Sequence, residues 1–448
     1  MLIESAQYLA TKEKDPKLHT FGIMAHAYQP PRQFLLSINF SDKAHHADFS
    51  IVPEINDTIT NQVYRPIFAE TLSLPPGLVT SIYASLRSYL KKNKPDIFQN
   101  IQEVVKRTLY HEYQVLGDPL VHVILPFLPK QDQLMLFEAG KKAFYNDFGF
   151  NPKGIWLPET AVSMNVLESA IESGYEFIPL RDSQVTGIPN NVQLDAEHNV
   201  CFVQTSLEKE IALLLGNSSL SGFVSFVPWS TYSAERFMKG RMDIDQRNGN
   251  NTLMMMDMER FGHHQIGAEK FLTKVLSIQQ DYGFIPLNMK HVIQDYRQGR
   301  PKTFLKVVEN SSWSCPHQLG RWTGDCNCDE PSEKALMMKK YLFKNLQEMN
   351  LQVNRWLDRE YSDWRQEFAH IFATLSDDIF TGVNFGPKLK NEMKIKDNEE
   401  IIKLFLAKIE IMIGMTSCGW FFGGDNSPER EIPFSMIQAV KSLYPEIL

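Results

Sequence analysis

The chain has 448 residues, enough for one large catalytic domain and a smaller companion, and its 43% hydrophobic and 22% charged residues are ordinary for a folded protein. The formal net charge is -7, with 46 basic and 53 acidic residues and no long basic stripe, which argues against a nucleic-acid partner. No run approaches the roughly 18 apolar residues of a membrane span, so we expect no membrane insertion.

The N-terminal segment, MLIESAQYLATKEKDPK, lacks the unbroken apolar stretch and small-residue cleavage site of a secretory signal. The five cysteines are odd in number, and three of them fall between residues 315 and 328. Both features argue against a disulfide framework and predict a cytoplasmic protein.

Short apolar runs alternate with longer amphipathic stretches from about residue 20 to about residue 300. The runs that predict strands are FGIMAH (21–26), VHVILPF (121–127), GIWLPE (154–159), EFIPLRD (176–182), CFVQT (201–205), FVSFVPW (223–229) and LMMMDME (253–259). Residues 132–145 and 162–174 are typical of helices between them. This alternation predicts a parallel sheet covered on both faces.

Polar side chains follow several of these runs, among them His26, Glu159, Arg181 and Asp257. In a β/α barrel the active site is built at this edge, because the loops after the strands converge there. The pattern therefore favours a barrel, without fixing the number of strands.

The character of the chain changes after about residue 330, at the loop-like residues 329–332. Apolar residues recur at helical spacing from Leu342 to Leu357, residues 401–415 form a second apolar-rich helical stretch, and another follows Pro433. We therefore expect a catalytic barrel over residues 1–330 and a helical domain docked on it over residues 331–448.

Two carboxylate motifs could carry chemistry. Glu159 follows an apolar strand and Pro158, beside Trp156, although a loop glutamate that caps a helix would look the same. In LMMMDMERFGHH, Asp257 and Glu259 would share one face of a strand, and His263 and His264 follow them. Glycoside chemistry needs one ionised and one protonated carboxyl across the scissile bond, and Glu159 with Asp257 could supply them.

Histidines and cysteines offer further candidates. His26 precedes a Pro-Pro turn and His122 lies within an apolar run; each could be a hydrogen-bonded core residue or could bind a sugar hydroxyl. The segment SSWSCPHQLGRWTGDCNC (311–328) presents Trp313 and His317. Its residues Cys315, His317, Cys326 and Cys328 suit a tetrahedral zinc site by residue type, but not by a well-attested spacing, so free thiols in a substrate loop remain the alternative.

These stretches together resemble glycoside hydrolase family 57. Trp156 to Glu159 matches the family's Trp-Leu-Pro-Glu motif, and Asp257 to Gly262 is similar to its Asp-x-Glu-x-Phe-Gly motif. His26 to Pro30 resembles the first motif with two extra residues between His and Gln, and His122 is the best match to the second.

One branch of the family is more similar still. It shares a His-x-Ile-Leu-Pro run, a Ser-Trp-Ser-Cys-x-His…Arg-Trp segment and a late Ser-Cys-Gly-Trp-Phe-Phe, here His122 to Pro126, Ser312 to Trp322 and Ser417 to Phe422. The resemblance thus runs from about residue 20 to about residue 425.

The resemblance implies an incomplete (β/α)7 barrel followed by a helical region, and a retaining reaction on α-linked glucans that ends in hydrolysis or in transfer to another sugar. It implies Glu159 as nucleophile and Asp257 as acid/base, an oligo- or polysaccharide as substrate, and no cofactor. The substrate-binding residues that we predict are His26, His122, Trp156, His263, His264, Trp313, His317 and Trp420, the last as a sugar platform over the barrel mouth. The insertion in the first motif alters the pocket floor, so amylase specificity does not follow.

Two other classes of protein stay open. A metal-dependent carbohydrate deacetylase could recruit His26, Asp257, His263 and His264 as ligands, although Glu159 would then have no role. A non-catalytic glucan-binding protein could keep the same fold.

Overall fold

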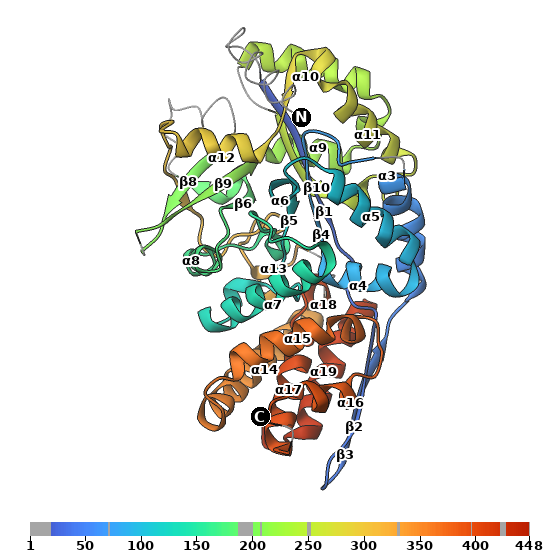
Figure 1. Cartoon of the computed structure of the whole chain (residues 1–448), viewed down its shortest axis with the longest axis vertical. Coiled ribbons are helices and arrows are strands. Elements are labelled where there is room, and N and C mark those ends of the chain that lie inside the picture. The colour runs from blue at the N-terminus through green and yellow to red at the C-terminus, as the bar shows by residue number, and fades with distance from the viewer. Residues whose placement is uncertain are drawn as a thin grey trace.

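A computed structural model describes residues 19–69, 72–186, 200–206, 208–248, 252–328, 332–395, 397–421 and 427–447. The N-terminal segment, the expected domain boundary at residues 329–331 and Phe422 lie outside them. Figure 1 shows an elongated molecule in which a sheet wrapped by helices forms one half and the C-terminal helices form the other.

Four parallel strands form the centre of the sheet, in the order β10 (Thr252–Asp257), β1 (His19–Ala27), β4 (Leu78–Ile82) and β5 (Val115–Leu116). Their side chains are buried almost throughout, as expected for parallel strands covered on both faces. The strands predicted at residues 21–26 and 253–259 are confirmed, with the second ending at Asp257.

The sheet continues as a barrel. Gly117, just after β5, bridges to Ile155, and Gly154 bridges to Phe177 in β6 (Phe177–Arg181). β6 is parallel to β9 (Glu210–Gly216), and the amide of Asn217 donates to the Leu253 carbonyl of β10 at 2.9 Å. Seven extended segments of the described chain thus follow one another around the ring. The segment at residues 154–155 is too short for a regular strand, so the barrel is an incomplete (β/α)7 barrel.

Two of the predicted strands are wrong. Residues 125–127 of VHVILPF form the short helix η2 (Leu125–Phe127), where Pro126 has no N–H to give to a strand ladder. Most of FVSFVPW lies in α9 (Ser218–Phe226), whose first turn is capped by the Asn217 side chain. A short apolar run cannot by itself separate a buried strand from a buried helix. CFVQT does form β8 (Val200–Gln204), but β8 is antiparallel to β9 and lies outside the ring.

The predicted helices are confirmed with small changes in their ends. Residues 132–145 fall in α7 (Lys130–Phe148) and residues 162–174 largely in α8 (Met164–Glu172). The C-terminal helices are α14 (Glu333–Glu360), α15 (Trp364–Phe380), α16 (Gly386–Glu392), α17 (Glu399–Gly414), α18 (Cys418–Phe421) and α19 (Glu431–Leu443). No helix in the described ranges is both long and apolar enough to cross a membrane.

The remaining regular elements cover the barrel or connect its parts. They are α2 (Glu54–Ile59), α3 (Arg65–Ala69), α4 (Ala84–Asn93), α5 (Pro95–Arg107), α6 (His111–Gln114), β7 (Val185–Thr186), α10 (Ala234–Asn248), α11 (Ala268–Ile278), β11 (Phe284–Pro286), α12 (Met289–Arg297), β12 (Lys306–Val307) and α13 (Gly320–Thr323).

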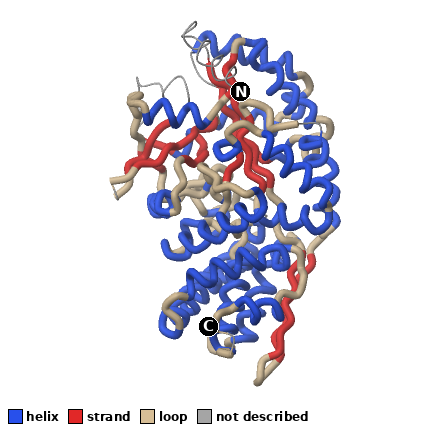
Figure 2. The backbone as a smooth tube through the Cα atoms, viewed as in Figure 1, coloured by secondary structure: helices blue, strands red, loops and turns tan. Residues whose placement is uncertain are grey.

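A hairpin of β2 (Gln33–Asn39) and β3 (Ala44–Ser50) leaves the barrel and runs along the C-terminal helices (Figures 1 and 2). Every second residue of both strands is buried, so one face packs on those helices. His45 contacts Glu410 of α17 at 2.6 Å, and Lys43 donates to the Ser442 carbonyl at 2.9 Å. Residues from both ends of the sequence therefore share one apolar core, which also reaches the barrel.

Candidate active site

The carboxyl ends of the central strands bring three polar residues together. His26 in β1 pairs in register with Asp257 in β10 and with Ser81 in β4. Parallel strands in register direct such residues to the same face. The His26 ring confirms this arrangement, since its Nδ1 lies 2.6 Å from the Ser81 Oγ.

Glu159 lies in η3 (Pro158–Thr160), just after the short barrel segment at residues 154–155. Its φ of 55° and the Thr160 φ of 48° are both in the left-handed region, which costs a non-glycine residue about 1–2 kcal/mol. The amide of Trp313 holds this turn by donating to the Glu159 carbonyl (3.2 Å) and to Thr160 Oγ1 (3.0 Å). Strain of this kind concentrates at functional residues.

Three side chains donate hydrogen bonds to the Glu159 carboxylate. Trp313 Nε1 is 3.1 Å and Ser314 Oγ is 2.8 Å from Oε2, and Ser417 Oγ is 3.5 Å from Oε1. Burial is the largest influence and leaves the pKa of Glu159 raised, while these donors and Arg321 oppose the rise. The environment thus provides partners for an ionised, half-buried carboxylate.

The surroundings of Asp257 are different. Its side chain reaches solvent, yet protein surrounds it closely enough that desolvation is the main cause of a strongly raised pKa. The neighbouring Glu259 and Glu159 charges raise the pKa further, and Arg181 opposes them. Among the described residues no side chain or amide donates to this carboxyl. Asp257 is therefore favoured in its protonated form.

Glu259 does not share a strand face with Asp257 as expected, because β10 ends and η6 (Met258–Arg260) begins between them. Its buried Oε1 accepts from Tyr64, from the Tyr28 amide at 3.1 Å and from Gln29 at 3.4 Å. Burial raises the pKa of Glu259 to about 7. This carboxyl anchors the loop after β1.

A buried chain of hydrogen bonds leads to Glu159. His26 Nε2 is 3.3 Å from His122 Nε2, and His122 Nδ1 is 2.6 Å from Ser417 Oγ. Burial lowers the pKa of His26 to about 3 and lowers that of His122 well below its usual value, so both rings are neutral. Each ring then has one N–H donor and one acceptor nitrogen.

The carboxylate fixes the direction of this chain. Because a carboxylate only accepts, the Ser417 hydroxyl donates to Glu159, and its oxygen accepts from His122 Nδ1–H. His122 Nε2 is then the acceptor for His26 Nε2–H, and the Ser81 hydroxyl donates to His26 Nδ1. All four donors point toward Glu159.

A comparison with protein families shows which family has this fold and these motifs. The model of glycosyl hydrolase family 57 matches residues 5–308, more than half of the chain. The chain belongs to glycosyl hydrolase family 57.

Sequence relatives match only a part of this family 57 chain. The 4-alpha-glucanotransferase of Thermococcus litoralis is 27% identical over 124 residues, which are 27% of this chain and 18% of that protein. The alpha-amylase of Pyrococcus abyssi is 28% identical over 127 residues, with the same shares. The matched region is thus less than a fifth of either relative.

Solved structures match nearly the whole chain. An exo-type maltose-forming amylase from Pyrococcus sp. ST04 has a TM-score of 0.70 at 14% identity and covers 96% of this chain and 79% of its own. A family 57 branching enzyme from Pyrococcus horikoshii has a TM-score of 0.59 at 12% identity and covers 95% and 88%. The structural similarity to these two enzymes therefore covers both the barrel and the helical region of this chain.

The aromatic residues predicted to bind substrate differ in exposure within this family 57 site. Trp156 is fully buried and stacks on His26, with ring centroids 4.8 Å apart, so it supports the site from below. Trp313 is half-buried and meets Trp156 edge-on at 5.4 Å. Trp420 is only 2% exposed, and its indole N–H donates to the Gly414 carbonyl. The expected platform at Trp420 is wrong in this structure, because its ring packs inside the helical region.

The other predicted histidines lie away from the two carboxyls. His263 and His264 occupy the turn after η6, where their amides donate to the Glu259 carbonyl, and His263 Nδ1 contacts Gln62. His317 Nδ1 lies 3.0 Å from Cys328 Sγ. Only His26 and His122 join the hydrogen-bonded chain to Glu159.

The structure adds Ser314 and Ser417 to the site, and it places Arg181, one of the polar residues noted at the strand ends, beside Trp313. Arg181 donates to the Trp313 carbonyl at 2.9 Å and lies over the Trp313 ring. Serine is too common for its spacing to indicate a role, and only the Ser-Trp-Ser-Cys and Ser-Cys-Gly-Trp runs could have drawn attention to these two serines.

The metal ligands of the deacetylase alternative do not converge. In the described ranges, the group of three or more His, Cys, Asp or Glu side chains suited to one ion is Cys315, His317, Cys326 and Cys328. His26, Asp257, His263 and His264 form no such group, because the His26 and His263 rings are bonded elsewhere.

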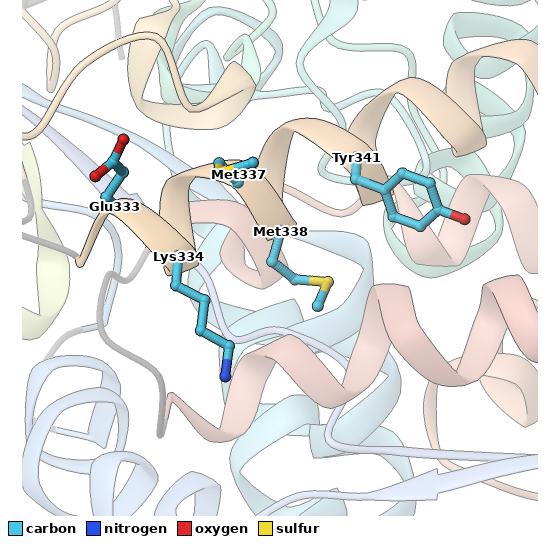
Figure 3. Close-up of a pocket in the computed structure, with 5 residues that line it drawn as sticks. All are labelled: Glu333, Lys334, Met337, Met338 and Tyr341. Atoms are coloured by element: carbon cyan, nitrogen blue, oxygen red, sulfur yellow. The ribbon is translucent and has the colours of Figure 1, made fainter.

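A separate hollow lies on the outer face of α14 (Figure 3). Glu333, Lys334, Met337, Met338 and Tyr341 line it and project from two turns of the helix. None of the residues predicted for the active site lines this hollow.

Proposed function

We propose that this chain is a retaining glycoside hydrolase or 4-α-glucanotransferase that acts on α-linked glucans. The observation that carries the proposal is the contrast between the two carboxyls. Glu159 accepts three hydrogen bonds, whereas Asp257 is desolvated and faces two other acidic groups. Retaining chemistry needs this pair of one ionised nucleophile and one proton donor. The similarity to a 4-alpha-glucanotransferase and an alpha-amylase supports α-glucans as the substrate class.

In the first half of the reaction, the Glu159 carboxylate attacks the anomeric carbon and the bond to the leaving oxygen breaks. Asp257 transfers its proton to that oxygen, so the shorter glucan leaves as a neutral alcohol. The product is a glycosyl ester on Glu159, and Asp257 is then ionised.

In the second half, Asp257 removes a proton from water or from a sugar hydroxyl, which attacks the ester and frees Glu159. Water gives hydrolysis, and a second glucan gives transfer. Two inversions restore the α-configuration, for which the carboxyls should be about 5–5.5 Å apart.

The half-buried Trp313 is the side chain that we propose as the sugar-facing aromatic surface. Its indole N–H is fixed on Glu159 and Arg181 covers its ring, so its orientation is set before substrate arrives. His26 and His122 have their ring nitrogens engaged in the buried chain, so we propose that they support the pocket floor.

Incubation with a maltooligosaccharide ladder tests this function. We expect shorter products from hydrolysis, or both shorter and longer products from transfer, and none from the Glu159→Gln chain. Proton NMR of the first product should show the α-anomer before mutarotation, as retention requires. A β-anomer as first product would contradict the double displacement.

The glucan-binding alternative predicts a different result from the same materials. Wild-type chain and Glu159→Gln would then both leave the ladder unchanged while both retaining affinity for immobilised glucan. That pair of results would show that the chain binds glucan without catalysing a reaction on it.

Ser417→Ala tests the buried chain of hydrogen bonds. The variant removes one donor from Glu159 and leaves His122 Nδ1–H without its acceptor. A hydrogen bond to a charged group contributes about 1.5–3 kcal/mol, and at 3.5 Å we expect the lower end, about a tenfold loss in kcat.

The pH profile distinguishes this positioning role from a general loss of stability. The Ser417 donor lowers the pKa of Glu159, so its removal should raise that pKa. Activity should then be lost at a higher pH as pH falls, a shift of up to about one pH unit. Ser376→Ala is the matched control, because Ser376 is buried but donates only within α15, to Ala373. An unchanged acid limb in Ser417→Ala would remove Ser417 from the site.

A further inference from the structure

Four side chains with soft or nitrogen donor atoms meet at one side of the candidate active site. Cys315 and His317 precede the short helix α13, and Cys326 and Cys328 follow it. The donor atoms of all four lie within 4.8 Å of one another. Neither the family match nor the relatives assign anything to this group, and the proposed glycoside reaction does not use it.

We propose that Cys315, His317, Cys326 and Cys328 bind one zinc ion. A tetrahedral ion with Zn–S bonds of about 2.3 Å separates its sulfur ligands by about 3.8 Å. The Sγ of Cys315 lies 3.7 Å from that of Cys326 and 3.9 Å from that of Cys328. Three thiolates and one imidazole are a common set for structural zinc.

The imidazole needs only a small movement to complete the tetrahedron. His317 Nδ1 is 3.0 Å from Cys328 Sγ, whereas zinc would hold them about 3.6 Å apart. His317 is exposed and can make this adjustment, and Cys326 and Cys328 are only half-buried. The ion can therefore enter from solvent, with the three thiol protons released as the thiolates form.

The backbone between the two ligand pairs is shaped to bring them together. Gln318 has a φ of 59° and Gly324 a φ of 77°, so the chain turns before and after α13. A Cβ on Gly320 would lie 3.3 Å from the Cys326 Cβ, tighter than most such contacts.

The same segment carries two of the donors to Glu159. Trp313 and Ser314 directly precede Cys315, and both bind Glu159 Oε2. On the other side, Lys339 of α14 donates to the Arg321 carbonyl at 2.9 Å. The zinc ion would therefore pin this loop between α14 and Glu159. Its effect on catalysis rests on the proposed function, but the binding of zinc does not.

Metal analysis of the full-length chain, purified under reducing conditions, is the first test. We expect about one zinc per chain, since structural sites of this type hold their ion through purification. Replacement by Co²⁺ should give the visible bands of a tetrahedral thiolate site. A chain that carries no zinc and binds no added Zn²⁺, or that carries iron instead, would overturn the assignment.

Alanine variants locate the ion. Cys326→Ala and Cys328→Ala should each lose most of the zinc, whereas Cys201→Ala should keep it, because Cys201 is buried in β8, away from the cluster. His317→Ala alters an exposed residue and should retain the fold but bind zinc more weakly. Zinc that remains in all three ligand variants would place the ion elsewhere and refute the site.

A structural readout separates this inference from the glycoside function. Removing zinc by chelation should expose the loop to trypsin at Arg321, which fragment masses would report. If zinc binds as expected but the chain has no glucan activity, the site stands and the proposed function fails. If glucan activity is present but zinc is not bound, the function stands and the site fails.

Discussion

Replacing Glu159 by glutamine is expected to lower kcat on maltooligosaccharides by about 10⁴-fold or more, because Glu159 is the carboxylate that forms the glycosyl ester in the proposed mechanism. The amide cannot attack, and it also removes the charge that orders the donors around it. Initial rates with maltoheptaose or an aryl α-maltooligoside would measure this loss.

The fold should survive the change. The glutamine carbonyl can accept from Trp313 and Ser314, and its NH₂ can donate to the Ser417 oxygen, so the buried contacts of Glu159 are kept. The melting temperature should therefore stay close to the wild-type value. Glu172→Gln on the exposed surface of α8 is the matched control and should retain full activity. A Glu159→Gln chain that turns over normally would exclude Glu159 as nucleophile.

Asp257→Asn is expected to slow the reaction most for substrates whose leaving oxygen must be protonated before it departs. A positioned general acid contributes about 10²–10⁴-fold, so natural glucans should lose that factor in kcat. Aryl glycosides with acidic phenols need little protonation and should lose far less in the first half of the reaction. Asp281→Asn, at an exposed position, should leave both substrates unaffected.

The pH dependence and azide rescue identify the role of Asp257 more closely. Its pKa is raised and the acid must be protonated, so wild-type activity should fall as pH rises through that pKa. Asp257→Asn should lose this alkaline limb but keep the acid limb of Glu159. With Asp257→Ala, azide should attack the glycosyl ester and give an α-glycosyl azide. A normal alkaline limb in Asp257→Asn would transfer the acid role to Glu259, whose pKa is about 7.

The sequence predicted the barrel where the strands are long and fully apolar. β1 and β10 are clear because their residues are buried on both faces, and the carboxyl end of β10 places Asp257 correctly. It failed where strands are short or contain polar residues. β4 contains Thr80 and Ser81 and β5 has two residues, so neither was predicted. The strand predicted at residues 154–159 is present only as a segment at residues 154–155 that makes isolated bridges.

Within the site, residues that follow a strand were predictable and residues brought in by distant segments were not. Asp257 lies at a strand end and Glu159 just beyond a barrel segment, where function concentrates. Ser417 reaches Glu159 only because Thr416 pairs with Val123, which no local pattern encodes. The prediction that Trp420 is exposed to substrate was wrong for a similar reason. The Trp420 ring packs against Phe343, and this contact depends on how α18 meets α14.

The link between Ser417 and His122 has a consequence for protein synthesis. The two residues are 295 positions apart in sequence, so their hydrogen bond closes a very long loop, and we expect it to form late in folding. A ribosome will have produced both carboxyls long before it reaches Ser417. A nascent or truncated chain can therefore contain Glu159 and Asp257 without the donor that helps to position Glu159. We expect glucan turnover to reach its full rate only after the segment around Ser417 has folded back onto the barrel, so that full activity reports the folding of that segment.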